Sequence, residues 1–207
     1  QHTIRAINNV EAIKVKKINV KAPSIVSQKE LIELSGIRIG QGILEVSTLS
    51  AQKQLNKHKW VKKAKVRRSL PSTINIDITP KKVKALAMIN NELFYIDEEG
   101  KKIDKFTPGH YNDVIVINSK QENYPRAINS IYELKKLEPV SELAIEQDVL
   151  SIYSSKFHFK IKVDIDNIDS SLSKAFMVIK DLEGRGEKAK TIDASLPGNK
   201  VVVIGKY

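Results

Sequence analysis

The stretch HKWVKKAKVRRSLPSTINIDITPKKVKAL, residues 58–86, decides the fold of the first part of the chain. Between residues 61 and 70, Ala64 and Val66 alternate with lysine and arginine, and Pro71 follows as a turn residue. Isoleucines at positions 74, 76 and 78 then alternate with Asn, Asp and Thr, which is typical of a strand with one buried face. The stretch therefore predicts two successive strands, with the basic side chains of the first on its solvent face.

The segment before this stretch predicts a strand and a short helix. Residues 13–20 alternate between apolar and polar types well enough for a strand. Ser27 is followed three residues later by Glu30, which is the pattern of a capping box at a helix start. Gly36 is expected to end this helix.

A second short helix is predicted after a glycine-containing loop. Ser47 or Thr48 can cap its start, and it reaches toward Asn56. The resulting order is strand, helix, helix, strand, strand. We expect a compact α+β domain with both helices packed on one face of the sheet.

The rest of the chain predicts a mostly β domain with flanking helices. Strands are expected at residues 93–96, 101–103, 114–117, 142–145, 150–153, 157–163, 190–194 and 201–204. Helices are expected at residues 123–137 and 172–182, and Gly184 should stop the second. The predicted organisation is a polar lead-in at residues 1–12, a first domain at 13–84 and a second domain at 85–207.

Positive charge is concentrated in the first half of the chain. The net charge is +11, and residues 1–105 carry 21 Lys and Arg against 10 Asp and Glu, whereas residues 106–207 carry 14 of each. An anionic partner or surface is therefore expected for the first half.

Cysteine is absent, which excludes disulfides and fits an extracytoplasmic protein. No run approaches the ~18 apolar residues of a membrane helix, and a start at Gln1 indicates that an upstream segment was removed.

No motif in the sequence is typical of a catalytic or metal site. The four histidines lack ligand spacing, and residues 36–42, GIRIGQG, lack the order of a phosphate-binding loop. Residues 164–169, DIDNID, begin like a calcium loop but place Asp169 where glycine is needed and Ala175 where the chelating glutamate should be. We interpret this segment as a turn that caps the next helix. The sequence predicts a non-enzymatic protein without a cofactor.

Nucleic-acid binding is an alternative interpretation of the basic stretch. Trp60 is the one aromatic ring within it, whereas single-strand binders use several exposed rings. We predict instead that Trp60 is buried where the second helix meets the following strand, while the lysines are solvated. A basic nucleic-acid-binding protein remains the third hypothesis for function.

Three segments resemble the FtsQ/DivIB family of bacterial cell-division proteins: KKINVKAPSIVSQKELIELSG, KHKWVKKAKVRRSLPSTINIDITPKKVKALAMI and ELFYIDEEGKKI. The family has a POTRA domain with a recurring phrase, and the positions in register with it are Trp60, Val61, Ala64, Val66, Arg68, Pro71, Thr73, Ile74, Ile76 and Ala85. The chain departs from that phrase at residues 79–82, TPKK, where family members commonly have Glu-Arg and then Pro. The resemblance covers residues 13–204 and is strongest up to residue 105. It implies a POTRA domain followed by a β domain of the FtsQ/DivIB type.

The resemblance also implies a function and a location. The full protein would be a single-pass protein of the inner (cytoplasmic) membrane, and this chain would be its periplasmic or extracytoplasmic part. It would act as a divisome scaffold that binds FtsB/DivIC-like and FtsL-like proteins at the septum, with its basic POTRA domain near an anionic membrane surface. POTRA domains also occur in outer-membrane protein assembly and secretion, which is the second hypothesis.

The last predicted strand is the expected partner-binding site. A terminal strand is easily left at a sheet edge, where a strand from another chain can add to it, and in FtsQ-like proteins the matching strand is where the FtsB-type partner docks. The alternative is an inner strand buried on both faces, which continuous valines also suit. The predicted partner-binding residues are Leu196, Gly198, Asn199, Lys200, Val201, Val202, Val203 and Ile204, together with Lys174 and Lys180 on the neighbouring helix.

Overall fold

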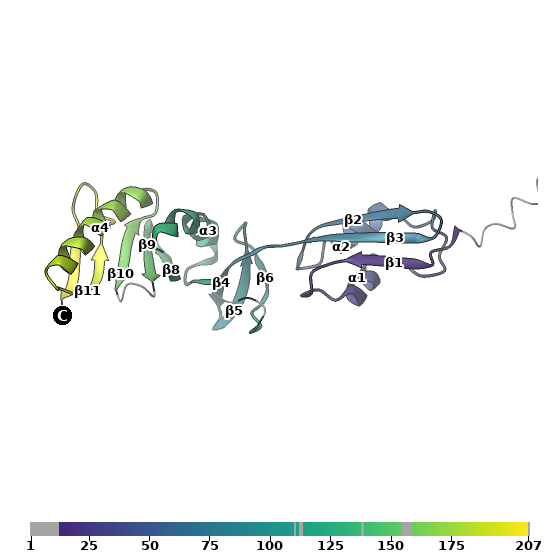
Figure 1. Ribbon diagram of the computed structural model, residues 1–207, viewed down its shortest axis with the longest axis horizontal. Coiled ribbons are helices and arrows are strands. Elements are labelled where there is room, and N and C mark those ends of the chain that lie inside the picture. The colour runs from purple at the N-terminus through teal and green to yellow at the C-terminus, as the bar shows by residue number, and fades with distance from the viewer. Residues whose placement is uncertain (1–12, 110, 112–113, 138, 155–158, 207) are drawn as a thin grey trace, which may run out of the picture. The chain divides into compact units, whose positions relative to one another are not determined.

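The computed structural model describes residues 13–109, 111, 114–137, 139–154 and 159–206 (Figure 1). The lead-in predicted at residues 1–12 lies outside this part. The chain divides into two compact units, Gln1–Lys81 and Lys82–Tyr207. The expected boundary after residue 84 falls inside the first strand of the second unit.

The first unit is a three-stranded sheet with two helices. Its elements are β1 (Lys17–Lys21), α1 (Gln28–Ser35), α2 (Thr48–Leu55), β2 (Val61–Ser69) and β3 (Thr73–Pro80). The sheet has the order β1-β3-β2, with β1 parallel and β2 antiparallel to β3. Both helices lie along one face of the sheet (Figure 1). The predicted α+β order of strand, helix, helix, strand, strand is confirmed.

The first strand is shorter than expected, because the residues before Lys17 pair with the connection between the two helices. The backbone N–H of Val15 donates to the carbonyl of Gln41 at 2.8 Å, and the N–H of Ile43 donates to the carbonyl of Ile13 at the same distance. This pairing buries Val15 and Ile43 completely. The connection between the helices is thus fixed against the start of the sheet.

Both helices of the first unit begin at predicted capping residues. The hydroxyl of Ser27 accepts from the backbone N–H of Glu30 at 3.4 Å. Ser47, rather than Thr48, is the N-cap of α2. Gly36 ends α1 with a φ of 70°, a left-handed conformation that glycine adopts without steric cost.

Trp60 is buried between α2 and β2, as predicted, with 4% of its surface exposed. Its backbone N–H donates to Nδ1 of His58 at 3.2 Å, and Nε2 of the same imidazole lies 3.3 Å from a carboxylate oxygen of Glu30 in α1. A backbone N–H can only donate, so Nδ1 is the acceptor and Nε2 carries the proton that faces Glu30. The histidine therefore connects α1 to the start of β2.

The second unit is a nine-stranded mixed sheet with two α-helices. Its elements are β4 (Val83–Ile89), β5 (Glu92–Asp97), β6 (Lys102–Lys105), β7 (Ile115–Ile117), α3 (Tyr124–Glu133), β8 (Val140–Glu146), β9 (Val149–Ser154), β10 (Lys160–Asp164), α4 (Ile168–Gly184), β11 (Ala189–Asp193) and β12 (Val202–Lys206). The strand order is β12-β11-β10-β9-β8-β7-β4-β5-β6. The pairs β4–β7, β7–β8 and β10–β11 are parallel, and the others are antiparallel. The expected mostly β second domain with flanking helices is confirmed.

Several elements of this unit differ from expectation. The helix expected at residues 123–137 is α3 followed by a 3-10 helix at Leu134–Leu137. The strand expected at residues 157–163 is β10, which begins at Lys160, and residues 157 and 158 lie outside the described residues.

β4 was not predicted, because its sequence VKALAMI shows no apolar and polar alternation. It lies inside the sheet between β7 and β5, where a strand needs no polar face. The helix α4 includes Gly184 instead of stopping before it, and the left-handed residue after the helix is Gly186, with a φ of 67°.

On the β8–β11 side of the second sheet, one face is covered by α3 and α4 (Figure 1). The strands contribute Leu143, Ile152, Ile161 and Ile192 to the core beneath the helices, and each is almost completely buried. Neighbouring positions along these strands point to the opposite face, since side chains alternate across a strand. The second unit therefore has one helix-covered face and one open face on its β8–β12 side.

Candidate partner-binding site at the edge strand β12

β12 is the last strand of its sheet, and among the described residues it pairs with β11 alone. It begins at Val202 and continues to Lys206, so Lys200 and Val201 of the predicted strand lie before it. Val202 and Ile204 are 44% and 50% exposed, whereas Val203 packs against the core. The alternative of an inner strand buried on both faces is therefore wrong.

Along β12, the backbone N–H and C=O groups of successive residues point alternately toward β11 and toward the free edge of the sheet. The N–H of Ala194 donates to the carbonyl of Lys162 in β10, so the backbone groups of Thr191 face the other way, toward β12. Thr191 pairs with Ile204 in antiparallel register. The N–H and C=O of Ile204, and likewise of Val202, therefore point into the ladder with β11. Those of Val203 point outward at the free edge.

The opposite edge of the same sheet is built differently. β6 has four residues, KIDK, and both lysines are exposed. Lys105 also forms an ion pair with Glu92 of β5 at 2.6 Å. Short strands and charged side chains are devices that prevent strand addition. The β12 edge, by contrast, combines outward backbone groups with two exposed apolar side chains.

The loop before β12 is held by Lys174 of α4. Its ammonium donates to the carbonyls of Leu196 and Gly198 at 2.9 and 3.0 Å. At the start of this loop, the carboxylate of Asp193 accepts from the N–H and the hydroxyl of Ser195. Lys174 therefore supports the predicted site by fixing the loop that leads into β12.

The other predicted residues are placed less closely together. Asn199 and Lys200 are exposed on the loop just before β12. Lys180 is exposed on α4, six residues beyond Lys174, and this spacing places the two lysines on different sides of the helix. The structure thus brings Leu196, Gly198 and Lys174 together but does not bring Lys180 to that cluster.

Sequence reasoning missed the open face that continues inward from β12. Ile204 is in register with Thr191, Thr191 with Lys160, and Lys160 with Tyr153. The ammonium of Lys160 lies 5.7 Å from the centre of the Tyr153 ring. A partner strand on β12 would extend this row of side chains. Strand order is needed to find the row, because its members are spread from residue 153 to residue 204 of the sequence.

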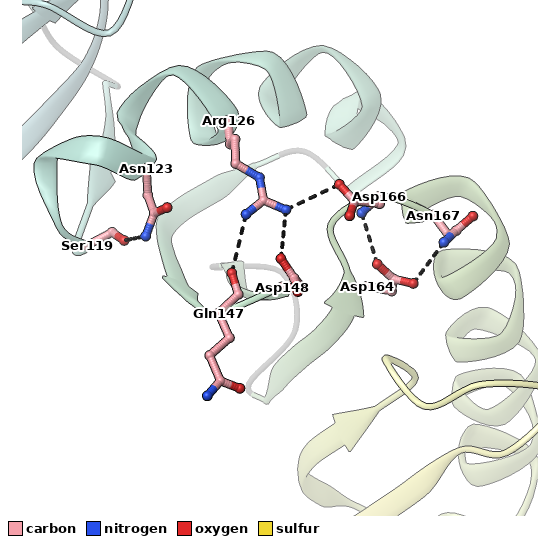
Figure 2. A network of polar contacts seen from close by, with 8 residues as sticks. All are labelled: Ser119, Asn123, Arg126, Gln147, Asp148, Asp164, Asp166 and Asn167. Atoms are coloured by element: carbon pink, nitrogen blue, oxygen red, sulfur yellow. Dashed lines mark hydrogen bonds and ion pairs between the residues drawn. The ribbon is translucent and has the colours of Figure 1, made fainter.

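A separate polar network connects α3 to two neighbouring turns (Figure 2). Arg126 donates to the carboxylates of Asp148 and Asp166 at 3.1 and 3.2 Å and to the carbonyl of Gln147 at 3.4 Å. The hydrogen bond to Asp148 raises the pKa of the arginine further above its ordinary value. Since both carboxylates are paired with one guanidinium, this network fixes structure and is no arrangement for acid–base catalysis.

The DIDNID segment forms the predicted turn, but the expectation that its side chains cap α4 is wrong, because the N-cap residue Asn167 makes no side-chain capping hydrogen bond. One carboxylate oxygen of Asp164 accepts from the amide of Asn167 at 2.8 Å, and the other accepts from the N–H of Asp166 at 2.9 Å (Figure 2). The side-chain bond from Asn167 is the main reason that the pKa of Asp164 lies below its ordinary value.

In the described part of the chain, no three His, Asp or Glu side chains are grouped to hold a metal ion. No helix of that part is long and apolar enough to cross a membrane.

Comparison with known proteins identifies the class of the first unit. Residues 13–79 match the family model for the POTRA domain of the FtsQ type. The match spans the strand, helix, helix, strand, strand unit, which a mixed β sheet then follows. The predicted POTRA domain followed by a mostly β domain is thereby confirmed.

Relatives extend the similarity over most of the chain. A cell division protein FtsQ from Geotalea daltonii is 25% identical over 96% of this chain and 78% of its own length. The cell division protein DivIB of Bacillus subtilis is 27% identical over 92% of this chain and 70% of its own length. The chain is thus similar to FtsQ and DivIB proteins over most of its length, and residues 13–79 match the FtsQ-type POTRA domain. The names of these relatives support a role in cell division.

Proposed function

We propose that this chain is a non-enzymatic scaffold of the bacterial division machinery, which binds a partner by strand addition to β12. The partner class is an FtsB/DivIC-like division protein, with an FtsL-like protein in the same assembly. The single observation that carries the proposal is the free edge of β12, with Val203 backbone groups facing outward and Val202 and Ile204 exposed.

Strand addition accounts for both affinity and specificity at such an edge. Main-chain hydrogen bonds supply affinity, and alternate side chains supply specificity. On the open face, partner side chains would lie beside Val202 and Ile204, so apolar residues fit there. On the opposite face, which α4 covers, the partner side chains would lie beside Val203. We expect a partner strand that carries apolar residues at every second position.

The proposed location is outside the cytoplasm, with the full protein held in the inner membrane by an upstream segment. The absence of cysteine is compatible with this location. A role in outer-membrane protein assembly receives no support from the relatives, which are named as cell division proteins. Nucleic-acid binding gains no exposed aromatic ring from the basic stretch, since Trp60 is buried.

The test measures binding of the partner's extracytoplasmic segment to proline variants of β12. Val203→Pro removes an outward N–H but no bond to β11, so the chain should stay folded by circular dichroism while binding weakens about tenfold or more. Val202→Pro is the matched control, because its N–H is in the ladder with β11. That variant should lower the melting temperature of the second unit.

A second pair of variants tests the side chains. Ile204→Lys places a charge on the exposed edge and should weaken binding, whereas Met177→Lys places it on an exposed position of α4 and should not. If both Val203→Pro and Ile204→Lys bind the partner as tightly as the parent chain, β12 is not the docking edge.

A further inference from the structure

Exposed apolar side chains of the first unit gather at one end of it. Among its described residues, the strongly exposed large apolar side chains are Ile39, Leu44, Leu49 and Leu70, all between 62% and 65% exposed. We call the end that carries them the basal end, formed by residues 13–17, 36–49 and 67–73. Backbone and side-chain hydrogen bonds place all four there.

The connection between the helices brings two of them to the start of the sheet. Gly40, next to Ile39, donates its N–H to the carbonyl of Val15 at 2.8 Å. Ile43, next to Leu44, donates to the carbonyl of Ile13 at 2.8 Å. Ile39 and Leu44 therefore project from the connection where it pairs with the first residues of the unit.

The other two come from the β2–β3 turn and the start of α2. The carbonyl of Ser72 accepts from the N–H groups of Lys16 and Lys17 at 2.8 and 3.2 Å, which puts the turn containing Leu70 beside the start of β1. Arg68, at the end of β2, donates to the carbonyl of Val46 at 2.6 Å. The first turn of α2, with Leu49, follows directly after Val46.

Cations surround these apolar side chains. Lys16, Lys17, Arg38 and Arg68 are all exposed at the basal end. The acidic side chain beside them is that of Glu45, whose carboxylate lies close to Gly42. The opposite end also carries exposed cations, including Lys29, Lys53 and Lys57, but none of the strongly exposed apolar side chains named above. Apolar exposure and positive charge thus coincide at the basal end.

This combination fits a lipid surface better than a protein partner. The apolar side chains come from separate turns and have cations between them, whereas a protein interface has a continuous apolar core of matching shape. A bilayer needs no matching shape. Its headgroup phosphates attract lysine and arginine, and its acyl boundary accepts isolated leucine and isoleucine side chains.

We propose that the basal end is a docking surface for an anionic lipid bilayer, in which Ile39, Leu44 and Leu70 enter the acyl boundary while the neighbouring cations bind headgroup phosphates. The proposal does not depend on β12, since it concerns different residues of a different unit. It gives the first unit a fixed orientation on a membrane, with β1 and β3 starting at the lipid.

The experiment measures sedimentation of the 207-residue chain with sucrose-loaded vesicles. Vesicles of phosphatidylglycerol and phosphatidylcholine should bind the chain, and vesicles of phosphatidylcholine alone should bind it weakly. The triple variant Ile39→Ser, Leu44→Ser, Leu70→Ser should lose most of the binding to anionic vesicles. Since all three positions are exposed, its melting temperature should match that of the parent.

Charge is tested with two matched triple variants. Replacing Lys16, Lys17 and Arg38 by Gln should weaken vesicle binding by about fivefold for each cation removed. Replacing Lys29, Lys53 and Lys57 by Gln removes the same charge from the opposite end and should have a much smaller effect. If the two variants lose vesicle binding to the same extent, the attraction is nonspecific electrostatics of the whole unit, and the proposal is overturned.

Insertion is tested with a fluorescent side chain at the basal end. Leu44→Trp should show a blue shift with anionic vesicles and quenching by brominated lipid, and Met177→Trp in the second unit should show neither. Binding without a blue shift at position 44 would refute insertion. If the chain binds no vesicle at all, or if the serine variant binds as well as the parent, the basal end serves another occupant, such as a protein.

Discussion

His58 and Trp60 lie in the connection between α2 and β2, and the indole of Trp60 is buried. The backbone N–H of Trp60 donates to Nδ1 of His58 and so helps to orient the imidazole. The histidine in turn reaches Glu30 of α1. Removing the indole leaves a cavity, whereas the backbone N–H of residue 60 that holds His58 remains.

Replacing Trp60 by Ala should destabilise the first unit by roughly 3 to 5 kcal/mol, the usual cost of removing a large buried aromatic ring. Urea unfolding followed by circular dichroism measures this loss. Met177→Ala, at a position that is 67% exposed, is the control and should change the free energy of unfolding by less than about 0.5 kcal/mol. An unchanged unfolding midpoint for the Trp60 variant would show that the indole is not part of the core.

At the scale of elements, the connection between β10 and α4 depends on one ionised carboxylate. Asp164 accepts from Asn167 and from the backbone of Asp166, and both bonds favour the charged form. The pKa of Asp164 in the folded chain is therefore lower than the ~3.9 of an unfolded aspartate. Its contribution to stability is complete above the unfolded pKa and is lost as the pH falls through the folded pKa.

Replacing Asp164 by Asn should lower the urea midpoint of the second unit near about pH 6, and this difference from the parent should shrink as the pH falls through the folded pKa of Asp164, where the parent carboxyl becomes protonated as well. Glu146→Gln removes an exposed carboxylate of β8 and serves as the control for loss of one charge. A difference that stays the same at every acidic pH would mean that the turn is stabilised by something other than the ionised group.

The elements also show what local sequence can and cannot predict. The isoleucines of β3 alternate because one face is buried under the helices, so periodicity alone identifies that strand. β4 has no such signal, since its position inside the sheet is set by pairing with β7, which lies about 30 residues later. The role of Lys174 could not be predicted either, because its acceptors are backbone carbonyls of a distant loop.

At the scale of the whole molecule, the two units have separate sheets and separate cores. β1, β2 and β3 form one sheet, and the nine remaining strands form the other. The unit Lys82–Tyr207 has an extensive core of its own beneath α3 and α4. A unit with its own core can fold by itself.

Residues 82–207 produced as a separate fragment should therefore fold and should bind the β12 partner as tightly as the full chain. Circular dichroism tests folding, and calorimetric titration with the partner segment tests binding. The fragment lacks the basal end, so it should also fail to bind anionic vesicles. An unfolded fragment would show that the first unit is needed for the second to fold.

The free edge of β12 has a consequence for the amount of protein that a cell can tolerate. Outward backbone groups beside exposed Val202 and Ile204 accept any compatible strand, including β12 of a second copy. Self-association and partner binding then compete for the same donors and acceptors. Under the proposed function, a chain made in excess over its partner would accumulate as dimers or aggregates, and balanced synthesis of the two proteins would keep the edge occupied.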